Sequence, residues 1–234
     1  MTAPLPFPPS RATPRISVAQ LGLYMVARAG RRETIIKQQR RPKIFRTNRY
    51  EDASRALQRA LAAGTDGLRV LAGERARLAA QVGGKEHEIQ NRALCIAALD
   101  AIAAAWGSLD FGGFLPALGH PSPPKLRIQE VGISVRPELI LHGRDDQGHP
   151  LIGAIKLRFS KTEPLPPDAA KYIAAAVEWH LEHVAGVGVN VSPVHCVVLD
   201  VFTGVTTRAP RAKARRRSDI AAACREIALG WEGL

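Results

Sequence analysis

The sequence predicts a mixed α/β fold, in which a central sheet is flanked by helices and preceded by a helical N-terminal region. Candidate elements follow one another in the order helix, strand, strand, helix, strand, helix, which is typical of such folds. A nearly continuous apolar run at residues 193–202 has the composition of a strand that is covered on both faces. The 234 residues, 46% of them hydrophobic, suffice for one substantial domain.

The N-terminal part divides into an arm and a basic helical region. Residues 1–15 are rich in proline and show no periodicity, so we expect a disordered or loosely docked arm. We expect the basic helical region over residues 16–84, with Ser17 capping its first helix and Pro42 ending the next. From residue 50 the composition is helical, and five glycines are predicted to divide it: Gly64, Gly67, Gly73, Gly83 and Gly84.

The predicted α/β core covers residues 85–234 and begins with a helix at 85–106. Two strands, 133–142 and 151–159, follow it and are joined by the polar turn GRDDQG. The second of these strands alternates, which places four residues on one face: Ile152, Ala154, Lys156 and Arg158. The remaining core elements are a helix at 166–185, the apolar strand 193–202, a short return strand and a helix at 218–231.

Charge predicts a polyanionic partner, because the formal net charge is +12 and the basic residues are concentrated in two stretches. Nine basic residues face a single acid, Glu33, between Arg28 and Arg49, and a second cluster precedes the C-terminal helix. Aromatic residues are sparse near both clusters, although Phe45 and Tyr50 are candidates for stacking, so we expect contacts with phosphates. The residues that we expect to bind nucleic acid are Arg31, Arg32, Lys37, Arg40, Arg41, Lys43, Arg211, Lys213, Arg215, Arg216 and Arg217.

Cysteine usage and hydropathy exclude several classes of protein. Cys95, Cys196 and Cys224 are far apart and form no metal-binding motif, so neither a disulfide framework nor a zinc site is predicted. The N-terminus lacks the pattern of a secretory signal, and no apolar run is long enough to cross a membrane. We therefore expect a cytoplasmic protein that does not associate with a membrane.

The element order, with Pro137-Glu138 in the first strand and Lys156 late in the second, resembles the PD-(D/E)XK nuclease superfamily. The similarity is greatest to its RecB and lambda-exonuclease-like branch, over residues 85–202, and it implies a restriction-endonuclease-like core. The resemblance further implies Glu138 as a metal ligand, Lys156 as the catalytic lysine and Glu88 as the acid of the preceding helix. Tyr172 resembles the tyrosine of the following helix. In such enzymes Mg²⁺ or Mn²⁺ is held by oxygen ligands and activates a water for phosphodiester hydrolysis.

The chain departs from the family pattern at the catalytic triplet, which reads Ala154-Ile155-Lys156 and lacks its carboxylate. Glu178 or Glu182 on the following helix are alternatives for the missing acid. Glu178 is however about 120° away from Tyr172 on a helical wheel, so the two side chains do not share a face.

Three functions are consistent with these features of the sequence. The first is a nucleic-acid-binding protein with an eroded metal site, for which DNA is the expected partner, acting as a subunit or targeting component of a complex. The second is an active Mg²⁺-dependent nuclease with rearranged carboxylates. The third is a protein–protein interaction module in which Trp179 or the helix that carries Trp231 docks a partner.

Overall fold

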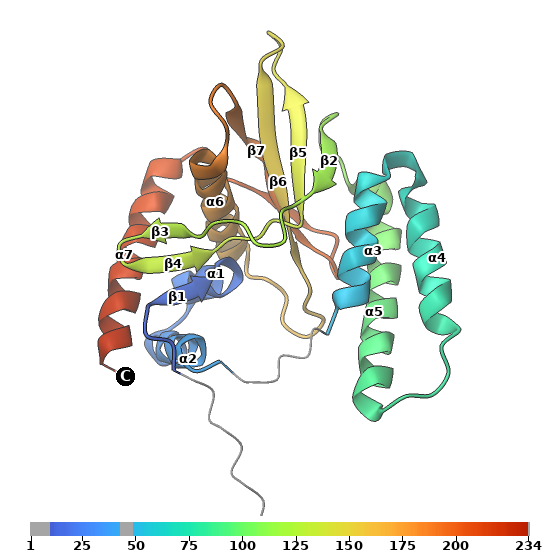
Figure 1. Cartoon of the computed structure of the whole chain (residues 1–234), viewed down its shortest axis with the longest axis horizontal. Helices are drawn as coiled ribbons and strands as arrows, with labels where there is room; N and C mark the ends of the chain where they lie inside the picture. Colours follow the sequence, from blue (N-terminus) through green and yellow to red (C-terminus); the bar gives the residue numbers. More distant parts are fainter. Residues whose placement is uncertain (1–9, 43–48, 234) are drawn as a thin grey trace, which may run out of the picture.

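A computed structural model of the chain describes residues 10–42 and 49–233 and confirms the mixed α/β fold (Figure 1). Short 3₁₀ turns at Gly64–Asp66 and Trp106–Ser108 follow α3 and α5. The elements in chain order are β1 (Arg15–Ser17), α1 (Val18–Val26), α2 (Ala29–Arg40), α3 (Glu51–Ala62), α4 (Gly67–Ala79), α5 (Glu86–Ala105), β2 (Leu115–Leu118), β3 (Leu126–Ile128), β4 (Val131–Ser134), β5 (Leu139–Arg144), β6 (Pro150–Arg158), α6 (Pro167–Val184), β7 (Asn190–Asp200), β8 (Thr206–Arg208) and α7 (Lys213–Glu232).

The strands form two mixed sheets. The larger sheet has the order β2-β5-β6-β7-β8, and within it only β6 and β7 run parallel, joined by α6. The smaller sheet has the order β1-β4-β3, with β1 parallel and β3 antiparallel to β4. Among the described residues no helix is long and apolar enough to span a lipid bilayer.

Helices cover both faces of the larger sheet. Ala154 and Cys196 belong to a core that includes Ile173 and Val177 of α6. The residues next to them in the strands point the other way, into a second core with α3 and α5, in which Ile155 participates. Figure 1 shows α6 on one side of the sheet and α3, α4 and α5 on the other. The predicted alternation of β6 is therefore confirmed.

The predicted strand at 133–142 is wrong, because it is two strands that belong to different sheets. β4 pairs with β1 and β3, whereas β5 pairs with β2 and β6. Pro137 lies between them and has no N–H for a strand ladder, which is a physical reason for the interruption. The stretch at 107–126, for which the sequence indicated no strand, contains β2 and the first residue of β3.

The predicted regions 16–84 and 85–234 do not separate the two cores. Ile16, Leu21 and Ile35 of the N-terminal region pack with α6 and α7, while α3 and α4 pack with α5. Residues 10–15 of the predicted arm are held by hydrogen bonds, since Arg11 N–H donates to the Arg40 carbonyl and Trp231 Nε1 donates to the Arg11 carbonyl. Residues 1–9 of that arm lie outside the described part of the chain.

The predicted helix boundaries are confirmed in part, as are the glycines predicted to separate the helices. Ser17 caps α1, since its hydroxyl oxygen accepts a hydrogen bond from the backbone N–H of Gln20. The long helix predicted at 85–106 is α5, and α2 ends before Pro42. Gly73 does not divide a helix as predicted, because it is an exposed residue inside α4.

Gly22 allows α1 to lie directly on α6, and we predict that Gly22→Ala destabilises the fold. A Cβ at position 22 would lie 2.8 Å from the carbonyl oxygen of Ala169 and 2.5 Å from Cγ1 of the buried Ile173. Overpacking of this kind raises the energy of the native state by about 1–3 kcal/mol. Urea unfolding measures the change. Gly73→Ala is the matched control, since a Cβ there meets nothing within 4 Å and gains up to about 1 kcal/mol of helix propensity. Equal stabilities for the two variants would contradict the prediction.

Candidate functional site

Glu138 and Lys156, the two central residues of the nuclease resemblance, contact each other directly. Glu138 precedes β5 and its backbone N–H donates to the Ile155 carbonyl, which brings it beside Lys156 on β6. The Lys156 ammonium donates to Glu138 Oε1 and, at 2.9 Å, to the carbonyl of Arg136. Glu138 Oε2 accepts the backbone N–H of Leu157 at 2.7 Å. Both oxygens of the carboxylate are therefore engaged within the protein.

The position of the missing carboxylate is filled by apolar packing. Ala154 is fully buried and pairs with Ile140 on one side and Cys196 on the other. It belongs to the core formed with α6, so this part of β6 offers no oxygen ligand for a divalent cation. Among the described residues, no group of three or more His, Cys, Asp and Glu side chains is arranged to hold a metal ion.

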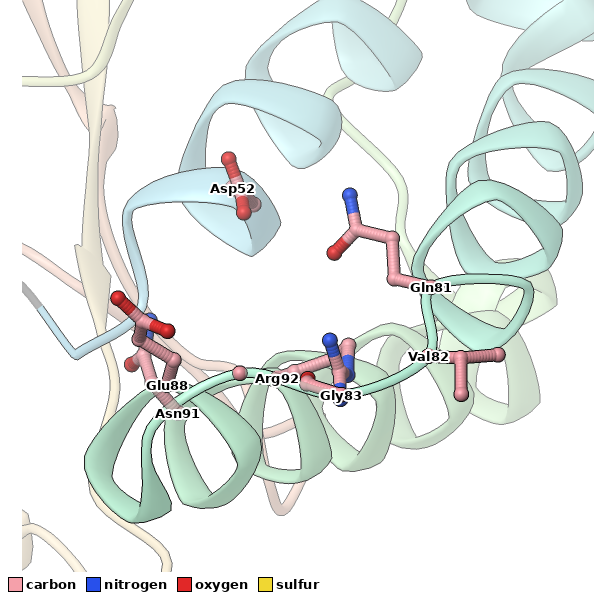
Figure 2. A pocket seen from close by; sticks show the side chains of 8 residues that line it. Asp52, Gln81, Val82, Gly83, Glu88, Asn91 and Arg92 are labelled. Carbon is pink, nitrogen blue, oxygen red and sulfur yellow. The ribbon is translucent and has the colours of Figure 1, made fainter.

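Glu88 lies in a different part of the molecule and has a local role. Its Oε2 accepts the backbone N–H of Lys85 at 2.8 Å, which caps the start of α5. Figure 2 shows Glu88 at a pocket of about 440 Å³ together with Asp52 of α3 and Gln81 of the loop before α5. The buried side of α5 packs with Ile155, so α5 covers the face of the sheet opposite to Lys156. The structure does not bring Glu88 together with Glu138.

The C-terminal basic cluster is largely neutralised by carboxylates of α6. Lys213 and Arg217 both contact Glu182, at 3.1 Å and 2.7 Å. Arg216 lies 3.6 Å from Asp168, and its guanidinium covers the ring of Tyr172 at 4.4 Å. The hydrogen bonds from Arg217 and Lys213 lower the pKa of Glu182, and burial acts against them.

The helix that carries these cations begins earlier than predicted. α7 starts at Lys213 and not at residue 218, so the three arginines at 215–217 lie in its first turns instead of before it. Cations there oppose the helix dipole, and an anion nearby offsets this unfavourable interaction. The structure supplies internal anions, because α6 lies beside α7 and presents Asp168, Glu178 and Glu182 to it.

Glu178 is the most deeply buried of these carboxylates, with an exposed fraction of 0%. Its Oε1 lies 3.6 Å from Lys213 Nζ and 3.7 Å from Arg217 Nη2, and neither of its oxygens has a hydrogen-bond partner. Burial raises the pKa of Glu178, and the charges of Arg217 and Lys213 act in the opposite direction. Burial, with a contribution from the charge of Glu178, raises the pKa of the Cys196 thiol. The sequence suggested Glu178 as a replacement metal ligand, but its neighbours are cations.

Several cations of the N-terminal basic cluster are engaged in contacts within the protein. Arg32 contacts Glu226 of α7 at 3.1 Å, Lys37 contacts Glu33, and Arg40 donates to the carbonyl of Trp231 at 2.6 Å. These contacts place α2 beside α7, as Figure 1 shows. Lys43 and Phe45 lie outside the described residues. Tyr50 stacks on Phe159 at 5.3 Å between ring centroids, so it packs internally.

Four of the predicted nucleic-acid contacts are exposed and have no ion-pair partner within residues 10–42 and 49–233: Arg31, Arg41, Arg211 and Arg215. Arg31 belongs to α2 and Arg41 is its C-cap, whereas Arg215 lies in the first turn of α7 and Arg211 precedes that helix. The other cations of the prediction, apart from Lys43, are paired with acids or hydrogen-bonded to carbonyl oxygens.

Sequence reasoning missed a further group of cations on the smaller sheet. Arg15 lies on β1 and Arg127 on β3, more than a hundred positions apart in the sequence, and each pairs with Gly132 of β4. Lys125 directly precedes β3. Neither strand was predicted, because a strand of three residues gives too short a pattern to recognise. The two arginines are also too far apart in the sequence to appear as a cluster of charge.

The tryptophans suggested as docking residues are both engaged within the protein. Trp231 is buried, and its indole N–H donates to the carbonyl of Arg11 at 3.0 Å. Trp179 is half-buried, with the guanidinium of Arg217 located 5.3 Å from its ring centroid.

Comparison with known proteins does not add to this geometry. The sequence matches no protein-family model, and no curated protein is detectably similar to it.

We predict that Glu138 and Lys156 are strongly coupled in stability. The side chains are 18% and 15% exposed, so removing one leaves a poorly solvated charge and lowers the free energy of unfolding by about 1–3 kcal/mol. A double-mutant cycle with Glu138→Gln and Lys156→Met, measured by urea unfolding, is expected to give a coupling energy above about 1 kcal/mol. The exposed pair Asp66–Arg69 is the control, with an expected coupling below about 0.5 kcal/mol. Equal coupling in the two pairs would contradict the assignment.

We predict that Glu178 makes the stability depend on pH. Its pKa is raised in the fold, so its contribution is fully present below the unfolded value and is lost as pH rises through the folded value. Glu178→Gln is uncharged at every pH, and its free energy of unfolding relative to the native protein is therefore expected to increase from acidic to neutral pH. Unfolding curves of both proteins at several pH values measure this difference. A difference that is constant with pH would refute the prediction.

Proposed function

We propose that the protein binds the phosphate backbone of nucleic acid through the cations of α2 and α7, and that it does not hydrolyse its partner. The observation that carries the proposal is the set of exposed cations without ion-pair partners among the described residues: Arg31, Arg41, Arg211 and Arg215. Within the described part of the chain, these four arginines keep their positive charge uncompensated, whereas the neighbouring cations are paired with acids of α6 and α7. An excess of exposed cations on neighbouring helices attracts a polyanion over several ångströms.

The state of Glu138 supports binding without cleavage. A hydrolytic metal site needs carboxylate oxygens that are free to coordinate a cation and an open position for water. Glu138 uses one oxygen for Lys156 and the other for a backbone N–H. We therefore propose a PD-(D/E)XK-like core whose catalytic residues have become a structural ion pair. DNA is the proposed partner, within a complex of several proteins.

One observation favours the second candidate, an active nuclease. Glu138 and Lys156 lie side by side, as a nuclease requires of its acid and its lysine. A divalent cation would have to displace Lys156 from Glu138 and recruit further oxygens, since Glu88 is on the opposite side of the sheet.

We predict that the protein binds labelled DNA and RNA with a steep dependence on salt and cleaves neither. The logarithm of the affinity should fall linearly with the logarithm of salt concentration, with a slope of roughly −0.9 per phosphate contacted in a duplex. Fluorescence anisotropy measures binding, and gel analysis with Mg²⁺ or Mn²⁺ measures cleavage. Affinity that does not change with salt, or no binding at all, would refute nucleic-acid binding.

The nuclease candidate has its own control in the same assay. Cleavage that needs Mn²⁺ or Mg²⁺ and that disappears in Lys156→Ala, with the variant still folded, would replace the binding proposal by the nuclease. Glu138→Ala should give the same loss in that case.

A further inference from the structure

Two arginines form a row across the outer face of the smaller sheet. Arg15 of β1 pairs with Gly132 of β4, and Gly132 pairs on its other side with Arg127 of β3. Residues that pair across strands project to the same side of a sheet. The adjacent residues Ile16 and Ile133 are buried in the core, so the row of Arg15, Gly132 and Arg127 faces outward.

Gly132 makes room for a third cation between the two arginines. A Cβ at position 132 would lie 3.3 Å from Cδ of Lys125, so the stem of this lysine passes over the glycine. The charges of Arg15, Arg127 and Arg11, together with some burial, lower the pKa of Lys125, and Arg15 has the largest effect. No carboxylate contributes to that shift. Arg15, Lys125 and Arg127 are therefore close enough to repel one another.

These three cations, which we call the β-sheet row, lack the internal neutralisation found elsewhere. Within the described residues, none of Arg15, Lys125 and Arg127 has an ion-pair partner, whereas Lys213 and Arg217 share the carboxylates of α6. Like charges held together on a rigid sheet raise the energy of the free protein, and a bound anion relieves that repulsion. An anion that binds at the row is therefore attracted by all three cations.

The β-sheet row is continuous with the end of α2. The guanidinium of Arg11 donates to the carbonyl of Gln39 at 2.9 Å, and the Arg11 N–H donates to the carbonyl of Arg40. Arg11 also influences Lys125 electrostatically, so it connects the two groups. The exposed Arg41 follows at the C-cap of α2. The cations therefore follow one another from β3 across β4 and β1 to the end of α2.

The outer face of the smaller sheet favours a duplex over a single strand. Its outward positions on the three strands hold no aromatic side chain: Arg15, Ser17, Arg127, Gly132 and Ser134. Proteins that bind single strands stack the bases on aromatic rings, whereas a duplex presents only backbone to such a surface. Arg15 and Arg127 are two strands apart, which is roughly 10 Å. A duplex carries on the order of six phosphate charges over that length.

We propose that the β-sheet row is the principal site at which this protein binds the phosphates of double-stranded nucleic acid. The inference rests on the proposed nucleic-acid binding and specifies its surface and the form of its partner. Lys213, Arg216 and Arg217 of α7, which carboxylates of α6 neutralise, contribute less than their density in the sequence suggests.

The first test removes two cations of the β-sheet row. Lys125→Gln/Arg127→Gln is expected to bind a labelled DNA duplex about tenfold or more weakly at low salt. The slope of log affinity against log salt should become less steep by about two units. The control Arg69→Gln/Lys85→Gln removes the same charge from two exposed positions, one in α4 and one directly before α5. This variant should bind the duplex like the native protein. Circular dichroism and thermal melting establish that the variants are folded.

The second test adds a carboxylate without removing a cation. Gly132→Asp places an anion between Arg15 and Arg127, and its Cβ would lie 3.3 Å from the flexible stem of Lys125 and 3.8 Å from the carbonyl oxygen of Pro14. Duplex binding should weaken by about tenfold or more, because the new carboxylate pairs with the cations of the row and repels the phosphates. Gly73→Asp in α4 is the matched control, since it makes the same charge change where a Cβ meets nothing.

The outcomes separate this inference from the proposed function. If the native protein binds duplexes with a steep salt slope and the β-sheet row variants bind equally well, the row is not the site, and nucleic-acid binding stands. If the native protein binds no nucleic acid at all, both proposals fall. Tighter binding of the matching single strand than of the duplex would overturn the choice of partner. An RNA duplex in a parallel titration distinguishes DNA from RNA.

Discussion

The parallel pairing of β6 and β7 is the interaction on which the rest of the structure depends. Parallel neighbours need a crossover, and here it is α6, whose inner side is buried against both strands. Because the inner side of α6 is buried, the side chain of Glu178 lies in the interior near Cys196. An ionised carboxylate there needs cations nearby, and Lys213 and Arg217 of α7 supply them. These contacts join α7 to α6.

This dependence changes the meaning of the basic residues. Arginines near a helix start look like a phosphate site when only neighbours in the sequence are counted. In the fold, Arg216 and Arg217 serve to dock α7 on α6, and their charge is largely neutralised. Arg15, Lys125 and Arg127 are inconspicuous in the sequence, yet they gather on a rigid sheet without a described acid to pair with. Density of charge along a chain and availability of charge on a surface are therefore different properties.

Glu138 and Lys156 form an ion pair that joins the segment before β5 to β6. Glu138 lies just before β5, Lys156 lies on the neighbouring β6, and their side chains contact each other. Their contacts are, however, saturated by each other, by the Arg136 carbonyl and by the Leu157 N–H. Next to them Ala154 contributes to the apolar core instead of to a metal site. The pair ties the segment before β5 to β6, which is a stabilising role that needs no metal.

The sequence by itself determined the elements with strong local signals: the long helix α5, the alternating strand β6, the apolar strand β7 and the cap at Ser17. It predicted strands at both Glu138 and Lys156, but only Lys156 lies on one, since β5 begins at Leu139. Only the tertiary structure decided that residues 133–142 divide between two sheets, that α6 neutralises α7, and that Arg15 and Arg127 flank Gly132. The physical reason is that local periodicity reports which face of an element is buried, whereas pairing and charge neutralisation depend on residues far away in the chain.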